Sequence, residues 1–407
     1  MLGDASSIRR MWSFSKALDL ALVDEEIEKG LQQPFGHQHG ERVAYIALAL
    51  GKGLGFPKEE LTSLMIAGLL HDIGAVGGFR QYHGDYRLMR EHCLVGSAIV
   101  RRFPDGENLS RVIQYHHETP DLSHSALRTD PEEVPLMSRI LALADKIDVH
   151  LSRHTMNRAE KENLIQWVKE HEGKLFFPEV IPPLLELARK EAFWIDLEQP
   201  DLMQIAFVLL GEPEYPPVPT VWDQQVTQDL AGIFADLIDQ KSAFTARHSR
   251  AVADTAEKLA RTFGWEEKRL NDIRVAGLLH DLGKLSIPKR ILDKPGQLDV
   301  EEVDVIRTHT YYTYRLLREA GFPQHVVNWA AYHHERLDGT GYPFALKAAA
   351  LDTGARLMTI ADIYAALTED RPYRKALTPG EALAILEKGV GKQVDPELII
   401  VARKALI

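Results

Sequence analysis

Residues 67–74 read Ala-Gly-Leu-Leu-His-Asp-Ile-Gly, and residues 276–283 read Ala-Gly-Leu-Leu-His-Asp-Leu-Gly. An adjacent His-Asp pair at the end of an apolar run offers an imidazole and a carboxylate, two common metal ligands, at one place. A single such pair is usually a surface or capping feature. Its repetition in the second half of the chain indicates a duplicated domain that carries a duplicated site.

Other ligand-type residues repeat at nearly the same spacing. His248 and His280 follow His39 and His71 by 209 residues (248 − 39; 280 − 71). Three further pairs have an offset of 217 residues (309 − 92; 333 − 116; 362 − 145): His92 with His309, His116 with His333, and Asp145 with Asp362. We therefore predict a tandem duplication of one domain, with a repeat too long for a solenoid.

Apolar residues recur at three- and four-residue spacing, for example in 273–279, 326–332 and 356–367, which indicates helices. Alternating patterns typical of strands are scarce, and a proline-rich piece at 216–219 marks a break near mid-chain. We predict an all-α fold of two tandem helical domains. Their expected bounds are 1–205 and 223–407, with a Pro-rich linker at 206–222.

Composition narrows the classes of partner. A chain of 407 residues can form two domains with sizeable cores, and a formal net charge of -11 argues against binding to polymeric nucleic acid. The single cysteine, Cys93, excludes an intrachain disulfide and suits a reducing compartment. No apolar stretch is long enough to span a bilayer. We expect a cytoplasmic protein that contacts no membrane.

The second half contains seven residues of metal-ligand type: His248, His280, Asp281, His309, His333, His334 and Asp362. Seven ligands exceed what one tetrahedral ion needs, so we predict two divalent ions, with a carboxylate such as Asp281 bridging them. A set without thiolates favours Fe or Mn over Zn or Ni. Two ions roughly 3.5–4 Å apart suit water attack on a phosphoester.

Three segments of the second half resemble the HD-GYP family, a branch of the HD phosphohydrolases. They are His280-Asp281-Leu282-Gly283-Lys284, then His333-His334 followed by Gly341-Tyr342-Pro343, and Arg371-Pro372-Tyr373-Arg374. The resemblance covers about 227–407. It implies an HD-type helical fold and a metal-dependent phosphodiesterase. Such enzymes hydrolyse cyclic di-GMP or 3′,3′-cyclic GMP-AMP to the linear dinucleotide.

The resemblance also implies roles for individual residues. Asp281 and Lys284 would be catalytic, with Lys284 on the scissile phosphate. The substrate-binding set would be completed by Arg371, Arg374, Gly341, Tyr342 and Pro343, although the arginines by themselves could be solvated loop charges.

Two departures from the family pattern stand out. Phe244 replaces a Glu that three-metal members carry, which favours two ions. Ala365 replaces an Asp that the first half keeps as Asp148, and the sequence offers no explanation for that change.

The first half keeps a matching ligand set: His39, His71, Asp72, His92, His116, His117 and Asp145. However, Ala75 replaces the lysine, and both the Gly-Tyr-Pro and Arg-Pro-Tyr-Arg segments are missing. We expect this half to bind metal without turning over a cyclic dinucleotide. The roles left open for this half are regulation, dimerisation, a second phosphohydrolase activity or an inert scaffold.

Two further readings apply to the whole chain. It could be a cyclic-dinucleotide sensor without turnover, or an HD-type mononucleotide phosphohydrolase. The Gly-Tyr-Pro segment argues against the mononucleotide enzyme, and the complete ligand set with Lys284 argues against the sensor. The base preference, the input signal and a homodimeric assembly are left open.

Overall fold

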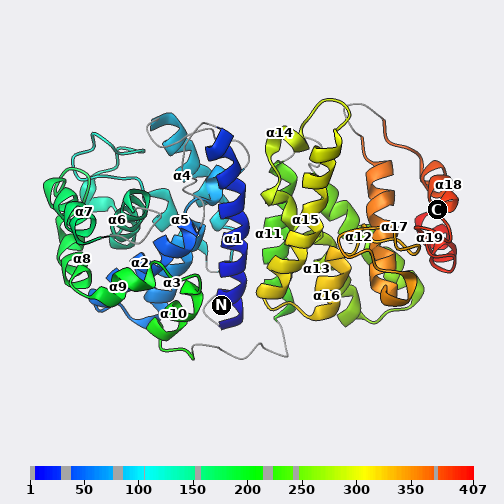
Figure 1. The fold of residues 1–407 in the computed structure, drawn as a ribbon, viewed down its shortest axis with the longest axis horizontal. Helices are drawn as coiled ribbons and strands as arrows, with labels where there is room; N and C mark the ends of the chain where they lie inside the picture. Colours follow the sequence, from blue (N-terminus) through cyan, green and yellow to red (C-terminus); the bar gives the residue numbers. More distant parts are fainter. Residues whose placement is uncertain are drawn as a thin grey trace. The chain divides into compact units, whose positions relative to one another are not determined.

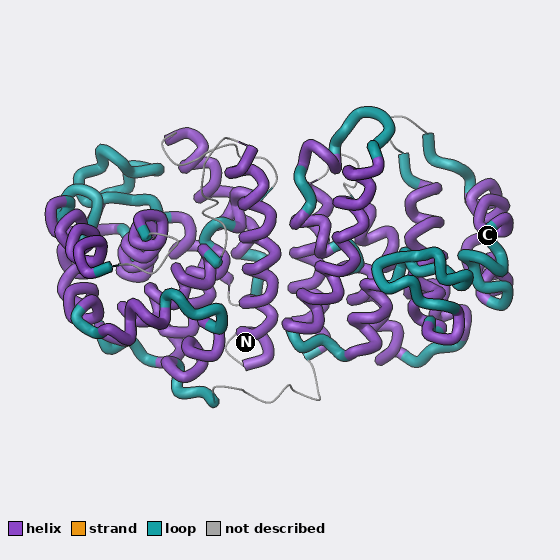
Figure 2. The backbone as a smooth tube through the Cα atoms, viewed as in Figure 1, coloured by secondary structure: helices purple, strands orange, loops and turns teal. Residues whose placement is uncertain are grey.

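The structure is a computed structural model that describes residues 5–28, 38–76, 86–104, 106–151, 157–213, 223–241, 247–370 and 375–407. Helices and loops account for these ranges, with only isolated β-bridges and no β-strand among them (Figure 2). The predicted all-α class is therefore confirmed. No helix in the described ranges is long and apolar enough to cross a membrane.

Contacts divide the chain into two compact units, residues 1–219 and 220–407. Figure 1 labels the helices of each. The first unit contains α1 (Ala5–Glu28), α2 (His39–Gly53), α3 (Lys58–Leu70), α4 (Tyr86–Val100), α5 (Gly106–Gln114), α6 (Leu136–His150), α7 (Arg158–Glu170), α8 (Ile181–Ala188), α9 (Glu191–Asp196) and α10 (Leu202–Leu209). The second unit contains α11 (Gln224–Lys241), α12 (His248–Phe263), α13 (Glu267–Leu279), α14 (Lys289–Leu292), α15 (Val300–Glu319), α16 (Gln324–Ala331), α17 (Thr353–Thr368), α18 (Pro379–Lys388) and α19 (Leu398–Leu406).

The end of the first unit overlaps the predicted linker. Helix α10 runs to Leu209 and packs on α2, and its residues Ala206 and Phe207 are buried. The first residues of the predicted linker, 206–209, therefore belong to a packed helix of the first unit. Residues 214–222 lie outside the described ranges, and the limits of the linker stay a prediction.

The two units repeat the same packing of helices. In the first unit α2 packs on α3 and α6, and α4 packs on α5. In the second unit α12 packs on α13 and α17, and α15 packs on α16. The paired helices carry ligand residues at matching positions, so the duplication seen in the sequence is also a duplication of structure.

Glycine allows the central helix pair of each unit to approach closely. A Cβ atom on Gly277 of α13 would lie 2.6 Å from the Cα atom of Ala253 on α12. A Cβ atom on Gly68 of α3 would lie 2.5 Å from the Cα atom of Ala44 on α2. These contacts set the spacing between the helix that begins with one ligand histidine and the helix that ends at the His-Asp pair.

Gly277→Ala should destabilise the second unit, because the new methyl group would force α12 and α13 apart. Overpacking of this kind costs about 1–3 kcal/mol. Chemical unfolding monitored by circular dichroism checks the change. Gly380→Ala is the control: Gly380 lies in α18 with no atom within 4 Å of the added Cβ, so alanine should be neutral or mildly stabilising there. Equal stability of the two variants would contradict the steric argument.

Candidate metal centres

The His-Asp pair of each unit lies at a change of helix type. His280 caps the C-terminal end of α13, and Asp281 begins a short 3₁₀ turn, η4 (Leu282–Ser286). His71 and Asp72 do the same between α3 and η1 (Ile73–Ala75). Because adjacent residues inside one α-helix diverge by about 100°, the change of helix type lets both side chains face one site.

In the second unit, Asp281 stands between two groups of histidines. Its Oδ2 atom lies 3.2 Å from His280 Nε2, while its Oδ1 atom lies 3.4 Å from His309 Nε2 and 3.9 Å from His333 Nε2. The ligand atoms form two groups, each with its atoms within 4.8 Å of one another: His248, His280 and Asp281, and His309, His333 and His334. A carboxylate with one oxygen toward each group has the geometry of a bridge between two cations.

Asp362 completes this cluster from α17. Its Oδ1 atom lies 3.1 Å from His248 Nε2, and its Oδ2 atom lies 3.8 Å from His334 Nδ1. A buried carboxylate is costly unless it is paired, and here its partners are imidazoles of both groups. All seven residues predicted as ligands of the second half therefore lie together.

Backbone carbonyls orient three of the imidazoles. The Nδ1 atoms of His280, His309 and His333 lie 2.8, 2.7 and 2.6 Å from the carbonyl oxygens three residues earlier. A ring that donates its Nδ1–H group to a carbonyl presents Nε2 as the free lone pair, as metal-binding histidines generally do. His71 and His116 make the same contact in the first unit.

The electrostatics leave most of these groups in their metal-binding forms. Burial lowers the pKa of His309 to about 3, so this ring is neutral at pH 7. Burial alone would raise the pKa of Asp281, but His280 and Lys284 outweigh it and hold that pKa well below its usual range. Neutral imidazoles beside ionised carboxylates are the form that divalent cations bind.

Two buried atoms support a cation at this place. His280 Nε2 and Asp281 Oδ1 make no hydrogen bond with any residue that the structure describes. Buried polar atoms are rarely left unsatisfied in native proteins. A divalent ion on these atoms would satisfy both, so the residues present fit the metals that the sequence predicts.

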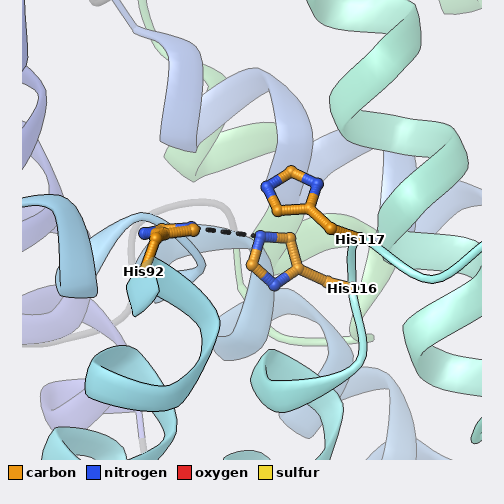
Figure 3. A group of neighbouring side chains, drawn as sticks. All are labelled: His92, His116 and His117. Atoms are coloured by element: carbon orange, nitrogen blue, oxygen red, sulfur yellow. Dashed lines mark hydrogen bonds between the residues drawn. The ribbon is translucent and has the colours of Figure 1, made fainter. Parts of the chain in front are cut away.

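The first unit assembles an equivalent cluster. Asp72 again faces both sides, with Oδ1 3.2 Å from His92 Nε2 and Oδ2 3.4 Å from His71 Nε2. His39 Nε2 lies 3.4 Å from Asp145 Oδ1. Figure 3 shows the rings of His92, His116 and His117 gathered at one point, with the Nε2 atoms of His92 and His116 3.3 Å apart. All seven ligand residues predicted for this half are likewise brought together.

Comparison with known proteins agrees with this duplication. Residues 36–150 and residues 232–398 each match a family model described as an HD domain. Two curated relatives come from Vibrio cholerae. The 3′3′-cGAMP-specific phosphodiesterase 1 is 30% identical over 86% of this chain and 83% of its own length. The 3′3′-cGAMP-specific phosphodiesterase 3 is 31% identical over 78% of this chain and 67% of its own length. The chain belongs to the HD-GYP family.

A solved structure supports the same assignment. The crystal structure of the cyclic GMP-AMP specific phosphodiesterase V-cGAP3 of V. cholerae matches with a TM-score of 0.67 at 26% identity. The match covers 98% of this chain and 97% of that chain. The likeness therefore extends through both units and is not limited to the one with the Gly-Tyr-Pro segment.

The HD-GYP motif residues that the structure describes lie beside the second cluster. The Nζ atom of Lys284 is 2.6 Å from Asp281 Oδ2, and the Tyr342 ring lies 4.9 Å from the ring of His334. The His334 side chain is 31% exposed, whereas that of His117 in the first unit is 1% exposed. The second cluster thus has one partly exposed ligand, His334, beside Tyr342. Arg371, Arg374 and Phe244 lie outside the described residues.

The loop that carries the Gly-Tyr-Pro segment is held by a residue that the sequence analysis missed. The buried Glu335 carboxylate accepts hydrogen bonds from the backbone N–H groups of Phe344 at 2.7 Å and Leu346 at 2.9 Å. In the first unit Glu118 accepts from Leu127 and Thr129 in the same way. The shared offset of 217 residues (335 − 118) was the available signal.

Backbone conformation in this loop is also shared by the two units. Gly339 and Ala345 have positive φ angles of 78° and 54°, and their counterparts Leu122 and Arg128 have φ angles of 59° and 58°. The residues that replace Gly341-Tyr342-Pro343 are His124-Ser125-Ala126. The first unit therefore keeps the left-handed backbone at two positions of the loop, but neither the cis peptide bond between Tyr342 and Pro343 nor the side chains that define the family.

Glu335→Ala should loosen the Gly-Tyr-Pro loop. Two backbone donors would lose their acceptor, at a cost of about 1–3 kcal/mol each, and the sum corresponds to a roughly 30-fold or greater increase in local opening. Hydrogen exchange of a peptide spanning 340–350 checks this. Glu387→Ala, which removes an exposed carboxylate paired with Arg403, is the control. Unchanged exchange in the Glu335 variant would mean that other contacts hold the loop.

Proposed function

We propose that the second unit is the metal-dependent phosphodiesterase of this chain and hydrolyses a cyclic dinucleotide to the linear form. The observation that carries the proposal is the position of Asp281. One of its oxygens faces each ligand group, and Lys284 Nζ lies 2.6 Å from the Oδ2 atom. Together with the exposed edge of His334, this arrangement supports a phosphoester site that a bulky anion can reach.

The chain's own residues would bind and orient the substrate. Lys284 would place its ammonium group against the oxygens of the scissile phosphate, where a positive charge stabilises developing negative charge. The Tyr342 ring, packed beside His334, would form one wall of the site. Two divalent ions, with Fe or Mn favoured, would supply Lewis-acid stabilisation and lower the pKa of an attacking water.

The first unit would have a different role. Its ligand cluster supports metal binding, but Ala75 stands where Lys284 does and Ser125 stands where Tyr342 does. Without the ammonium group and the aromatic wall, we expect no cyclic-dinucleotide turnover there. Regulation of the second unit and a second phosphohydrolase activity remain the alternatives. A homodimer and a cytoplasmic location stay predictions.

Asp281→Ala should abolish hydrolysis, because it removes the carboxylate that faces both ligand groups of the second unit. Asp72→Ala, the matched change in the first unit, should keep most of the activity. The assay incubates metal-loaded protein with cyclic di-GMP, 3′,3′-cyclic GMP-AMP and mononucleotides and resolves the products by chromatography. We would test 3′,3′-cyclic GMP-AMP first, because the relatives matched over most of their length are specific for it.

The same assay separates the competing functions. Binding of either cyclic dinucleotide without any product, under Mn or anaerobic Fe, would support a sensor and contradict the phosphodiesterase. Hydrolysis of mononucleotides alone would support a general HD phosphohydrolase. Equal losses in the two variants would show that the active unit is wrongly assigned.

Metal content should divide evenly between the units. We expect elemental analysis of the purified full chain to give about two ions per unit, by the ligand count of a two-ion site. Asp72→Ala and Asp281→Ala should each lose roughly half of the total. An unchanged content in Asp72→Ala would mean that the first cluster holds no metal, and the first unit would then be a scaffold.

A further inference from the structure

The first histidine of each cluster, His39 or His248, has a carboxylate beside its Nδ1 atom. In the first unit His39 Nδ1 lies 2.7 Å from Asp148 Oδ2. Asp148 is fully buried, and Arg42 holds it by donating from Nε to one oxygen and from Nη2 to the other at 3.3 Å. This contact fixes the His39 ring with Nε2 toward Asp72 and Asp145.

The second unit lacks both members of that pair. The residue equivalent to Arg42 is Ala251 (42 + 209), and the residue equivalent to Asp148 is Ala365 (148 + 217). Ala365 is buried and apolar, so nothing at this position can accept a hydrogen bond from His248. Both members of the charged pair are absent together, as expected if neither residue is useful without the other.

A different residue supplies the carboxylate to His248. Glu369, just after the end of α17, places Oε2 3.1 Å from His248 Nδ1. It follows the ligand Asp362 by seven residues, whereas Asp148 follows Asp145 by three. Positions i+3 and i+7 lie one turn apart on the same helix face, so the two acids can approach the same imidazole nitrogen.

We propose that Glu369 is the positioning residue for the metal ligand His248, and that it replaces in the second unit the role that Asp148 and Arg42 perform in the first. The proposal rests on the metal-dependent function described above. Glu369 would fix the tautomer and direction of the His248 ring so that Nε2 faces the cation shared with Asp362. This role of Glu369 also accounts for Ala365, which replaces the Asp of the family pattern at that position.

The carboxylates of Asp148 and Glu369 differ in how rigidly they are held. Asp148 is short, fully buried and held by an arginine, whereas the Glu369 side chain is longer and 23% exposed. Its second oxygen, Oε1, makes no hydrogen bond within the described part of the chain. Within the described residues, Glu369 is the one side chain in contact with His248 Nδ1, so a mutation of Glu369 tests that contact directly.

The test measures metal affinity in the full chain, in an Asp72→Ala background in which the second unit supplies the metal signal. Glu369→Ala should weaken metal retention against a competing chelator by about 10- to 100-fold, the usual cost of removing a partner of a ligand histidine. Glu369→Gln keeps an amide oxygen as acceptor and should recover part of the loss. Glu387→Ala should match the parent protein.

A relocation variant, which moves the Arg–Asp pair of the first unit to the equivalent positions of the second, tests directly whether Glu369 replaces that pair. Ala251→Arg and Ala365→Asp, added to Glu369→Ala, rebuild the first unit's device around His248 and should restore metal retention to within a few-fold of the parent. Circular dichroism checks that this variant is folded, because Ala365 is buried. If it does not fold, partial recovery by Glu369→Gln decides the question.

The outcomes are distinct from those of the proposed function. Parent-like retention in Glu369→Ala would overturn the proposal. So would a loss that neither the folded relocation variant nor Glu369→Gln recovers. Absence of turnover in the parent chain would overturn the phosphodiesterase proposal instead, and the retention measurements would still decide the role of Glu369.

Discussion

The arrangement of both units depends on one carboxylate that is buried between two groups of imidazoles. Asp281, like Asp72, can stay ionised in the interior only because positive or polarisable groups surround it. Three helices and two turns must therefore meet around it with a spacing that leaves room for cations. Gly277, which allows α12 and α13 to approach closely, and the carbonyls that orient three of the imidazoles serve this requirement.

Much of this could be predicted from the sequence, because the residues concerned are chemically uncommon. His-Asp and His-His pairs are rare enough that their repetition at fixed offsets predicted the residues that the structure brings together, and the helical spacing of apolar residues predicted the fold class. The limits of the linker stay a prediction, because the proline-rich piece at 216–219 marks the break but not where packing ends. Phe207, inside the predicted segment 206–222, is buried in helix α10.

The supporting residues were not predictable in the same way. Glu335 and Glu369 are ordinary glutamates in the sequence, and most glutamates are solvated surface charges. Their roles depend on contacts with residues nine or more positions away in the chain, such as Phe344 and His248. The missing acid at Ala365 is visible in the sequence, but the side chain that contacts His248 Nδ1 in its place depends on the fold.

The conserved loop conformation of the first unit has an evolutionary consequence. Leu122 and Arg128 adopt left-handed backbone angles that side chains other than glycine tolerate poorly, yet the loop persists without its defining residues. Two backbone N–H groups of this loop donate to Glu118, a contact that does not need the Gly-Tyr-Pro side chains. A framework duplicated in this way can acquire new chemistry through side-chain changes alone, and a lineage could gain or lose an activity there without rebuilding a fold.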